Sequence, residues 1–294
     1  MYYRRKILLA LLQQFGGKLG KIDLQKLLFL FCDSQNEPSY CFIPYNYGCF
    51  SFQANQDIST MVKYSQIEES DNHWQVIDKK DYLKELKMKD RIDIVRIYNK
   101  FKDLRGDSLI KFVYKNYPYF AIRSKIARKL LDEEDYHRVI ESVPIMNDVT
   151  LFTIGYESKS VESYTNQLIR ENIKVLCDVR KNPLSMKYGF SKNQLKNIVE
   201  NVGIEYIQIP GLGIESDKRK DLKTETDFFE LFNDYTLNTL PQKKDEISKL
   251  CDILIENKRI ALTCFEADYN CCHRSRVSDA ISEYFSGKYL VKHI

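Results

Sequence analysis

The segment Ile173-Lys-Val-Leu-Cys-Asp178, with Val179 and Arg180 directly after it, decides the fold of the second half of the chain. A short apolar run that ends in charged residues is typical of a buried strand in a parallel sheet. Three further runs of this kind are Leu151–Ile154, Gly203–Ile209 and Arg259–Cys264. Helical segments separate them, among them a long one over about 225–257. This alternation predicts a Rossmann-like α/β domain with a parallel sheet over residues 149–294.

Polar side chains gather where the predicted strands end. Tyr156 follows the first strand. Asp178 and Arg180 end the second, and Glu266 follows the fourth. Because ligands of open α/β sheets bind outside the carboxyl ends of the strands, these residues predict a ligand pocket. Tyr156 and Phe190 could stack on a flat ligand there, or they could only line the core or the rim.

The sequence Cys272-His273-Arg274 begins the last predicted helix. A helix N-terminus offers free N–H groups and the positive end of the helix dipole. Together with the guanidinium of Arg274, it predicts a site for an anion such as a phosphate or a carboxylate. In the alternative interpretation Arg274 pairs with Asp178 or Glu266 as an internal brace, and the sequence leaves both open.

Two cysteines are candidate nucleophiles. A thiol beside His and Arg at a helix start is expected to have a lowered pKa, which favours Cys272. Cys264 ends a strand, as phosphatase and sulfurtransferase nucleophiles do, but the tight Cys-x5-Arg loop of those enzymes is missing. Inert packing is the alternative for each thiol, since free cysteines are among the most buried residues. Asp178, Glu266 and His273 are candidate acid–base groups.

The sequence predicts neither a metal site nor a bound cofactor. A zinc site built from Cys264, Cys271, Cys272 and His273 is not expected, because adjacent side chains diverge and no Cys-x2-Cys pair occurs. The chain also contains no phosphate-binding Gly-x4-Gly-Lys-Ser/Thr motif and no Gly-x-Gly-x-x-Gly motif.

The sequence pattern of residues 1–148 predicts a different, mostly helical module. The expected elements are helices over Arg4–Phe15 and Ile22–Cys32, an aromatic hairpin or wing over 40–52, and helices near 56–66, 81–104, 107–116 and 121–132. Two helices joined by a Gly-rich turn and followed by a hairpin indicate a winged helix-turn-helix. Gln25 and Lys26 would then lie on the exposed face of the recognition helix, where they contact nucleic acid or are merely solvated.

Composition narrows the class of protein further. The formal net charge is only +4 and lies wholly in the first half, which is too little for a strong nucleic-acid footprint. The eight cysteines show no evenly spaced framework, so we expect reduced thiols and a cytoplasmic protein. No apolar run approaches the roughly 20 residues that a transmembrane helix needs, so no membrane partner is expected.

The second half resembles the bacterial family known as domain of unknown function 488. The matching stretches are Thr153-Ile-Gly-Tyr156; Asp178-Val-Arg180 with Pro183, Ser185 and Phe190-Ser-Lys192; Tyr206 with Pro210 and Leu212-Gly213; and Cys264-x-Glu266 with Cys272-His273-Arg274. One departure is Ile214, where the family usually has a second glycine. The resemblance implies the fold and the pocket, but it implies no reaction.

The first 65 or so residues resemble a winged-helix-like bacterial family. Its relatives include the Panacea or SocA-like antitoxin and proteolysis-adaptor proteins. The residues that carry the resemblance are Gly16-Gly17, Leu24-Gln-Lys-Leu-Leu-Phe29, Pro44-Tyr45 and Gly48-x-Phe50-Ser51. The resemblance implies a module that docks onto DNA or onto a protein partner.

Three functions fit these observations. The first is an enzyme that acts on a nucleotide, a nucleobase or a nucleic-acid end, with the first module as its docking device. The second is a non-catalytic regulator that senses a small anionic ligand. The third is a protein-interaction module of a defence or toxin–antitoxin system. A basic stripe around Gln25 and Lys26 would favour DNA as the partner, and a hydrophobic groove there would favour a protein.

Overall fold

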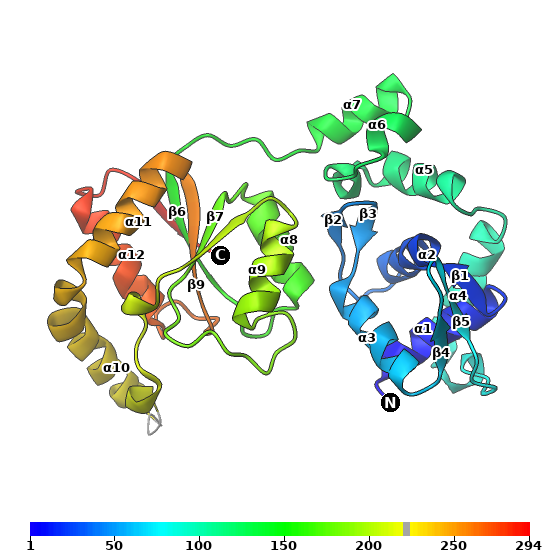
Figure 1. Ribbon diagram of the computed structural model, residues 1–294, viewed down its shortest axis with the longest axis horizontal. Coiled ribbons are helices and arrows are strands. Elements are labelled where there is room, and N and C mark those ends of the chain that lie inside the picture. The colour runs from blue at the N-terminus through cyan, green and yellow to red at the C-terminus, as the bar shows by residue number, and fades with distance from the viewer. Residues whose placement is uncertain (220–223) are drawn as a thin grey trace. The chain divides into compact units, whose positions relative to one another are not determined.

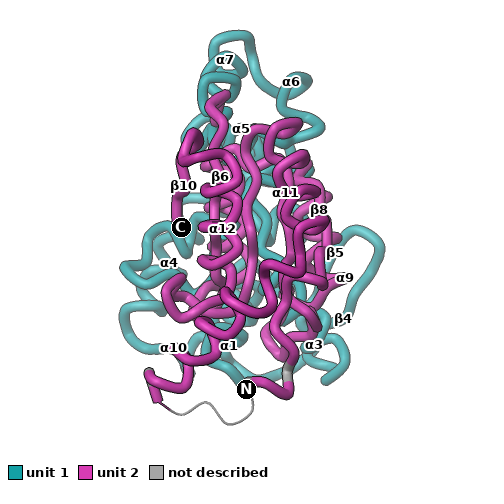
Figure 2. The backbone as a smooth tube through the Cα atoms, turned by 90° about the vertical axis from the view of Figure 1, so that its left-hand side faces the viewer, with its two compact units in different colours: residues 1–143 teal, residues 144–294 magenta. Residues whose placement is uncertain are grey.

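The computed structural model describes residues 1–219 and 224–294, and the chain divides into two compact units, Met1–Val143 and Pro144–Ile294 (Figure 2). The division lies slightly before the boundary at 148/149 that the sequence indicates. We call these two units the N-terminal unit and the C-terminal unit.

The N-terminal unit is mostly helical (Figure 1). Its helices are α1 (Tyr3–Gln14), α2 (Lys21–Asp33), α3 (Phe52–Lys63), α4 (Met88–Phe101), α5 (Asp107–Asn116), α6 (Ala127–Leu130) and α7 (Glu133–Glu141). Short 3-10 helices cover Leu83–Glu85 and Pro118–Ala121. The expected segment 121–132 is therefore not one helix but a 3-10 turn and a single α-turn.

Two small antiparallel sheets complete this unit. The aromatic hairpin expected over 40–52 is present as β2 (Ile43–Tyr45) and β3 (Gly48–Phe50). A three-stranded sheet, in the order β1 (Lys18–Gly20), β5 (His73–Val76) and β4 (Ile67–Glu69), was not expected from the sequence. The winged-helix interpretation of this unit stays a prediction.

Helix α2 lies in the middle of the apolar core of the N-terminal unit. All of its residues from Leu24 to Cys32 are buried, so the helix has no solvated face over this stretch. A helix that is buried all round is a core helix rather than an amphipathic surface helix. The expectation that Gln25 and Lys26 lie on an exposed face is therefore wrong: their side chains are only 4% and 1% exposed.

The C-terminal unit is an α/β domain built on a five-stranded, all-parallel sheet. The strands β6 (Thr150–Gly155), β7 (Val175–Asp178), β8 (Glu205–Gln208), β9 (Arg259–Cys264) and β10 (Leu290–His293) lie in the order β10-β6-β9-β7-β8. The helices are α8 (Val161–Arg170), α9 (Lys192–Glu200), α10 (Glu225–Asp234), α11 (Lys244–Asn257) and α12 (His273–Tyr284). Figure 1 shows α8 and α9 on one face of this sheet and α11 and α12 on the other.

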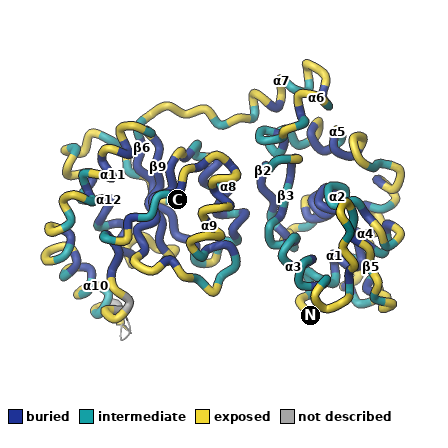
Figure 3. The backbone as a smooth tube through the Cα atoms, viewed as in Figure 1, coloured by how far each residue is buried: buried dark blue, intermediate teal, exposed yellow. Residues whose placement is uncertain are grey.

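Burial along the strands follows this arrangement (Figure 3). Every residue of β6, β7 and β9 is buried, because these inner strands are covered on both faces. The edge strands β8 and β10 are partly exposed. The apolar sequence signal is therefore strong for the three strands whose carboxyl ends carry the candidate site and weak for β10.

The helical segment expected over about 225–257 is broken. After α10 the chain forms a π-helical turn over Tyr235–Thr239 and a 3-10 turn over Leu240–Gln242 before α11 begins. Pro241 lies in this break and cannot continue a helix without losing a hydrogen bond. The break positions Tyr235, whose ring packs edge-on against His273 with the ring centroids 5.9 Å apart.

Candidate functional site

A cavity of about 340 Å³ lies at the carboxyl ends of β6, β7 and β9, where the sequence predicts a ligand pocket. We call it the strand-end cavity. Its lining consists of Tyr156, Arg180, Lys181, Asn182, Leu184, Ser185, Met186, Ile214, Cys264, Phe265, Glu266 and His273. Five of the predicted site residues are in this lining, whereas Asp178, Phe190, Cys272 and Arg274 are not.

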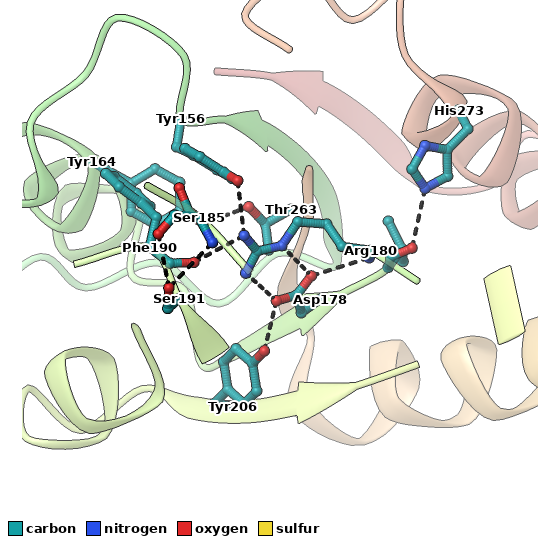
Figure 4. A network of polar contacts seen from close by, with 11 residues as sticks. Tyr156, Tyr164, Asp178, Arg180, Ser185, Phe190, Ser191, Tyr206, Thr263 and His273 are labelled. Atoms are coloured by element: carbon teal, nitrogen blue, oxygen red, sulfur yellow. Dashed lines mark hydrogen bonds and ion pairs between the residues drawn. The ribbon is translucent and has the colours of Figure 1, made fainter. Parts of the chain in front are cut away.

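Asp178 and Arg180 form a buried ion pair beside the cavity (Figure 4). The Nε and Nη2 of Arg180 donate to the two carboxylate oxygens of Asp178 at 2.8 and 2.5 Å. The hydroxyl of Tyr206 donates to the same carboxylate at 2.6 Å. Although burial alone lowers the pKa of Arg180, its hydrogen bonds and charge interaction with Asp178 raise it above the usual value. Asp178 therefore orients Arg180.

The aromatic residues Tyr156 and Phe190 stack on each other rather than leaving a slot between them. Their ring centroids are 4.3 Å apart and the ring planes differ by 9°. The Nη1 of Arg180 donates to the Tyr156 hydroxyl and to the Phe190 carbonyl, both at 2.9 Å. The exposed aromatic ring of the cavity is instead Phe265, which packs edge-on against Tyr156 and is 44% exposed.

Two thiols and an imidazole come together at the wall of the cavity, with Cys264 and His273 in its lining. Cys264, Cys272 and His273 are all buried, and their ligand atoms lie within 4.8 Å of one another. The Nδ1 of His273 is 3.7 Å from the Cys264 Sγ and 4.0 Å from the Cys272 Sγ. The expectation that Cys272 and His273 diverge is therefore wrong, whereas Cys271 is exposed and approaches Asp268 instead.

The physical reason for this convergence is the backbone at the start of α12. Cys272 is the N-cap residue and has an extended conformation, with φ −144° and ψ 138°. Because its neighbour His273 is already helical, the two side chains do not follow the spacing that either a strand or a helix would impose. Both can therefore point at Cys264, which ends β9.

The environment of Cys272 is not the one that the sequence predicts. Burial, and after it the neighbouring Cys264 thiol, raise the pKa of Cys272 well above its usual value. The opposing effect of Arg274 is smaller. The lowered pKa expected from the helix N-terminus is therefore wrong, because removal from water outweighs it.

Arg274 bonds backbone carbonyls rather than a carboxylate, and its predicted contact with an anion stays a prediction. Its side chain is 1% exposed and is not in the cavity lining. Nη1 and Nη2 donate to the backbone carbonyls of Glu266 and Ala267 at 2.5 and 3.0 Å. No carboxylate within residues 1–219 or 224–294 lies within ion-pair distance of it. Arg274 thus holds the loop after β9 through backbone oxygens.

Sequence reasoning missed several residues of the lining. Lys181, Asn182 and Ser185 belong to the segment that follows Arg180, and that stretch already carried part of the family resemblance. Ile214, the departure from the family pattern, is 7% exposed and lines the cavity. Gly213 beside it is required, because a Cβ there would lie 2.2 Å from the backbone nitrogen of Lys181.

Gln25 and Lys26 belong to the N-terminal unit and line a cavity of about 340 Å³ within it. The amide of Gln25 bonds the backbone of Ser51, and the ammonium of Lys26 donates to the Cys49 carbonyl at 3.0 Å. The other lining residues include the aromatic side chains Tyr45, Tyr47, Phe50 and Trp74.

Comparison with known proteins finds a family match within the C-terminal unit. Residues 160–281 match the family described as "Domain of unknown function DUF488". This match confirms the resemblance that the motifs of the second half predict. No curated protein matches the chain. Among the described residues, no helix is both long enough and apolar enough to cross a bilayer.

Proposed function

We propose that the C-terminal unit is an enzyme that acts on a small molecule of nucleobase or nucleotide size in the strand-end cavity. One observation carries this proposal: a thiol, an imidazole and a carboxylate, from Cys264, His273 and Glu266, line the same cavity. Such a combination supports nucleophilic and acid–base chemistry. At about 340 Å³ the cavity is at the lower end of the range of small-molecule sites.

The residues at the rim of the cavity indicate which class of substrate it would accept. Phe265, Leu184 and Met186 are exposed apolar side chains, and a flat ring can pack against them. Lys181 adds a half-exposed cation, which forms a loose ion pair of 3.7 Å with Glu215. A flat ring that carries a negatively charged group fits this rim. We therefore favour a nucleobase derivative as the substrate.

For the N-terminal unit we propose a protein partner rather than DNA. The cavity around Gln25 and Lys26 has aromatic walls, and these two side chains are buried rather than part of a basic stripe. Fluorescence anisotropy of a labelled duplex at low salt should therefore show no binding. Binding that is lost in Lys26→Met would contradict this proposal and restore DNA as the partner.

The enzyme proposal is tested by turnover. The purified full chain is incubated with a panel of nucleobases, nucleosides and nucleotides, and consumption of each is followed by mass spectrometry. We expect at least one compound to be consumed, at a rate that Cys264→Ser or Glu266→Gln lowers by a factor of about 100 or more. Cys251→Ser is the matched control, since Cys251 is also buried but lies on α11 outside the lining.

Three outcomes overturn the proposal. They are no consumption of any compound, consumption that Cys264→Ser leaves unchanged, and binding without consumption. Binding without consumption would identify a ligand-sensing regulator in place of an enzyme.

A further inference from the structure

We propose that Cys264, Cys272 and His273 form a three-ligand site for a thiophilic divalent cation, with zinc as the best fit, and that its fourth coordination position opens into the strand-end cavity. With an ion bound, Cys264 serves as a metal ligand in place of the nucleophile, and for its catalytic meaning the inference rests on the proposed function. As a binding site it stands on the geometry alone.

The spacing of the three ligand atoms suits a tetrahedral ion. Zn–S bonds of about 2.3 Å and Zn–N bonds of about 2.0 Å place neighbouring ligand atoms of a tetrahedron about 3.5–3.8 Å apart. Here the Nδ1 of His273 lies 3.7 Å from one sulfur and 4.0 Å from the other, and no pair of the three atoms is more than 4.8 Å apart. Side-chain adjustments of less than about 1 Å would complete the shell.

The imidazole presents the correct nitrogen to the two sulfurs. The Nε2 of His273 lies 3.1 Å from the carbonyl oxygen of Val179, and a carbonyl can only accept. Nε2 therefore carries the proton, and in the neutral ring the lone pair of Nδ1 faces the thiols. A backbone carbonyl on the far nitrogen is the usual outer contact of a metal-binding histidine.

The ring is also fixed in place before any ion arrives. Tyr235 packs edge-on against His273, and the Tyr235 hydroxyl is itself held by the Leu212 carbonyl at 2.7 Å. Arg274, the next residue along α12, donates hydrogen bonds to the carbonyls of Glu266 and Ala267, which follow Cys264 closely in the chain. The helix and the strand that supply the three ligands are therefore tied to each other through the backbone.

The donor set identifies the kind of ion. Two thiols and one imidazole favour zinc or a similarly soft ion over magnesium or calcium, which prefer oxygen. Structural zinc sites have four protein ligands, whereas catalytic sites have three and keep one position open. Cys264 and His273 line the cavity and Cys272 lies behind them, so the open position faces the cavity, where Glu266 also lies. An ion there would polarise a bound substrate.

The test is a cobalt titration of the full chain, stripped of metal with a chelator under reducing conditions. We expect one equivalent of Co²⁺ to produce a thiolate-to-cobalt charge-transfer band and intense visible bands of tetrahedral cobalt, both removed by zinc. Cys264→Ser, Cys272→Ser and His273→Asn should each weaken binding at least tenfold. Cys271→Ser is the matched control: this neighbouring thiol is exposed and outside the cluster, and the variant should titrate like the wild type.

A second measurement needs no variant and so does not depend on the variants folding. X-ray absorption of the zinc-loaded wild type should show two sulfur neighbours at about 2.3 Å and at least one nitrogen at about 2.0 Å. A shell without sulfur, or a cobalt spectrum that lacks the charge-transfer band, would overturn the site. So would wild-type binding in Cys264→Ser, or its loss only in Cys271→Ser. No substrate is present in either experiment, so the metal site is judged by the spectra and the proposed enzyme by turnover.

Discussion

Two buried cations, one in each unit, have very different surroundings. Arg180 in the C-terminal unit pairs with the carboxylate of Asp178 and also donates to the Tyr156 hydroxyl and the Phe190 carbonyl. Lys26 in the N-terminal unit donates to the Cys49 carbonyl. Within the part of the chain that the structure describes, no carboxylate lies within ion-pair distance of Lys26.

This difference shows that burial alone does not tell how a charge contributes to stability. A charge removed from water costs free energy unless an opposite charge and hydrogen bonds compensate it. Arg180 is compensated, so the fold depends on its partner. Lys26 is compensated less, by a hydrogen bond to a neutral carbonyl and by the charge of Asp23 beyond ion-pair distance, and burial lowers the pKa of its ammonium. We therefore expect opposite responses when the two arrangements are changed.

The largest effect is expected when the partner of Arg180 is removed. Asp178→Asn leaves the guanidinium buried without a counter-charge, which should lower the free energy of unfolding by about 3–5 kcal/mol. The measurement is urea denaturation at pH 7. Asp148→Asn is the control, since Asp148 pairs with the buried Arg259 but is itself 61% exposed, and it should cost much less than Asp178→Asn. Equal losses in both variants would contradict the comparison.

An intermediate effect is expected from the hydroxyl that supports the carboxylate. Tyr206→Phe removes a hydrogen bond to a charged group and should cost about 1.5–3 kcal/mol. Tyr164→Phe removes a bond of similar length, 2.7 Å, to the neutral hydroxyl of Thr263 and should cost about 1 kcal/mol. Both are measured by urea denaturation. If Tyr164→Phe lowered the free energy of unfolding more than Tyr206→Phe, the charge of Asp178 would not explain how much its hydrogen bonds contribute to stability.

The smallest effect is expected at Lys26, the less compensated of the two cations. Lys26→Met should change the free energy of unfolding at pH 7 by less than about 1 kcal/mol, in the stabilising direction. Burial lowers the pKa of Lys26 in the folded state below the ordinary lysine value of 10.5, so just below that pH the unfolded chain binds more protons than the folded one. Wild-type stability relative to the variant should therefore rise with pH across this interval. Urea denaturation at pH 7 and pH 10 tests the sign, and a gap that widens with pH in favour of Lys26→Met would refute it.

The inner strands and the location of the site are predictable from the sequence. β9 was expected with its observed bounds, because a strand that is buried on both faces consists almost entirely of apolar residues. β10 was missed, since three of its four residues are exposed and its sequence Leu-Val-Lys-His carries little apolar signal. The clustering of Tyr156, Arg180 and Glu266 follows from the general rule that parallel strands end at one edge.

The orientation of individual side chains is not predictable in this way. Cys272 and His273 are adjacent in sequence, and only the change of backbone conformation between them brings both to Cys264. Gln25 and Lys26 look like surface residues by chemistry, but the packing of other elements around α2 buries them. In both cases tertiary structure overrides the local pattern.

The hydrogen bonds from Arg274 to the carbonyls of Glu266 and Ala267 determine where the loop between β9 and α12 can change in length. These bonds hold the two ends of the loop together. Cys264 and Glu266 belong to the end at β9, and Cys272 and His273 belong to the end at α12. The remaining residues Asp268–Cys271 are exposed. Insertions or deletions there can be absorbed as a longer or shorter bulge into solvent, whereas one extra residue between Cys264 and Glu266 would separate the thiol from the carboxylate.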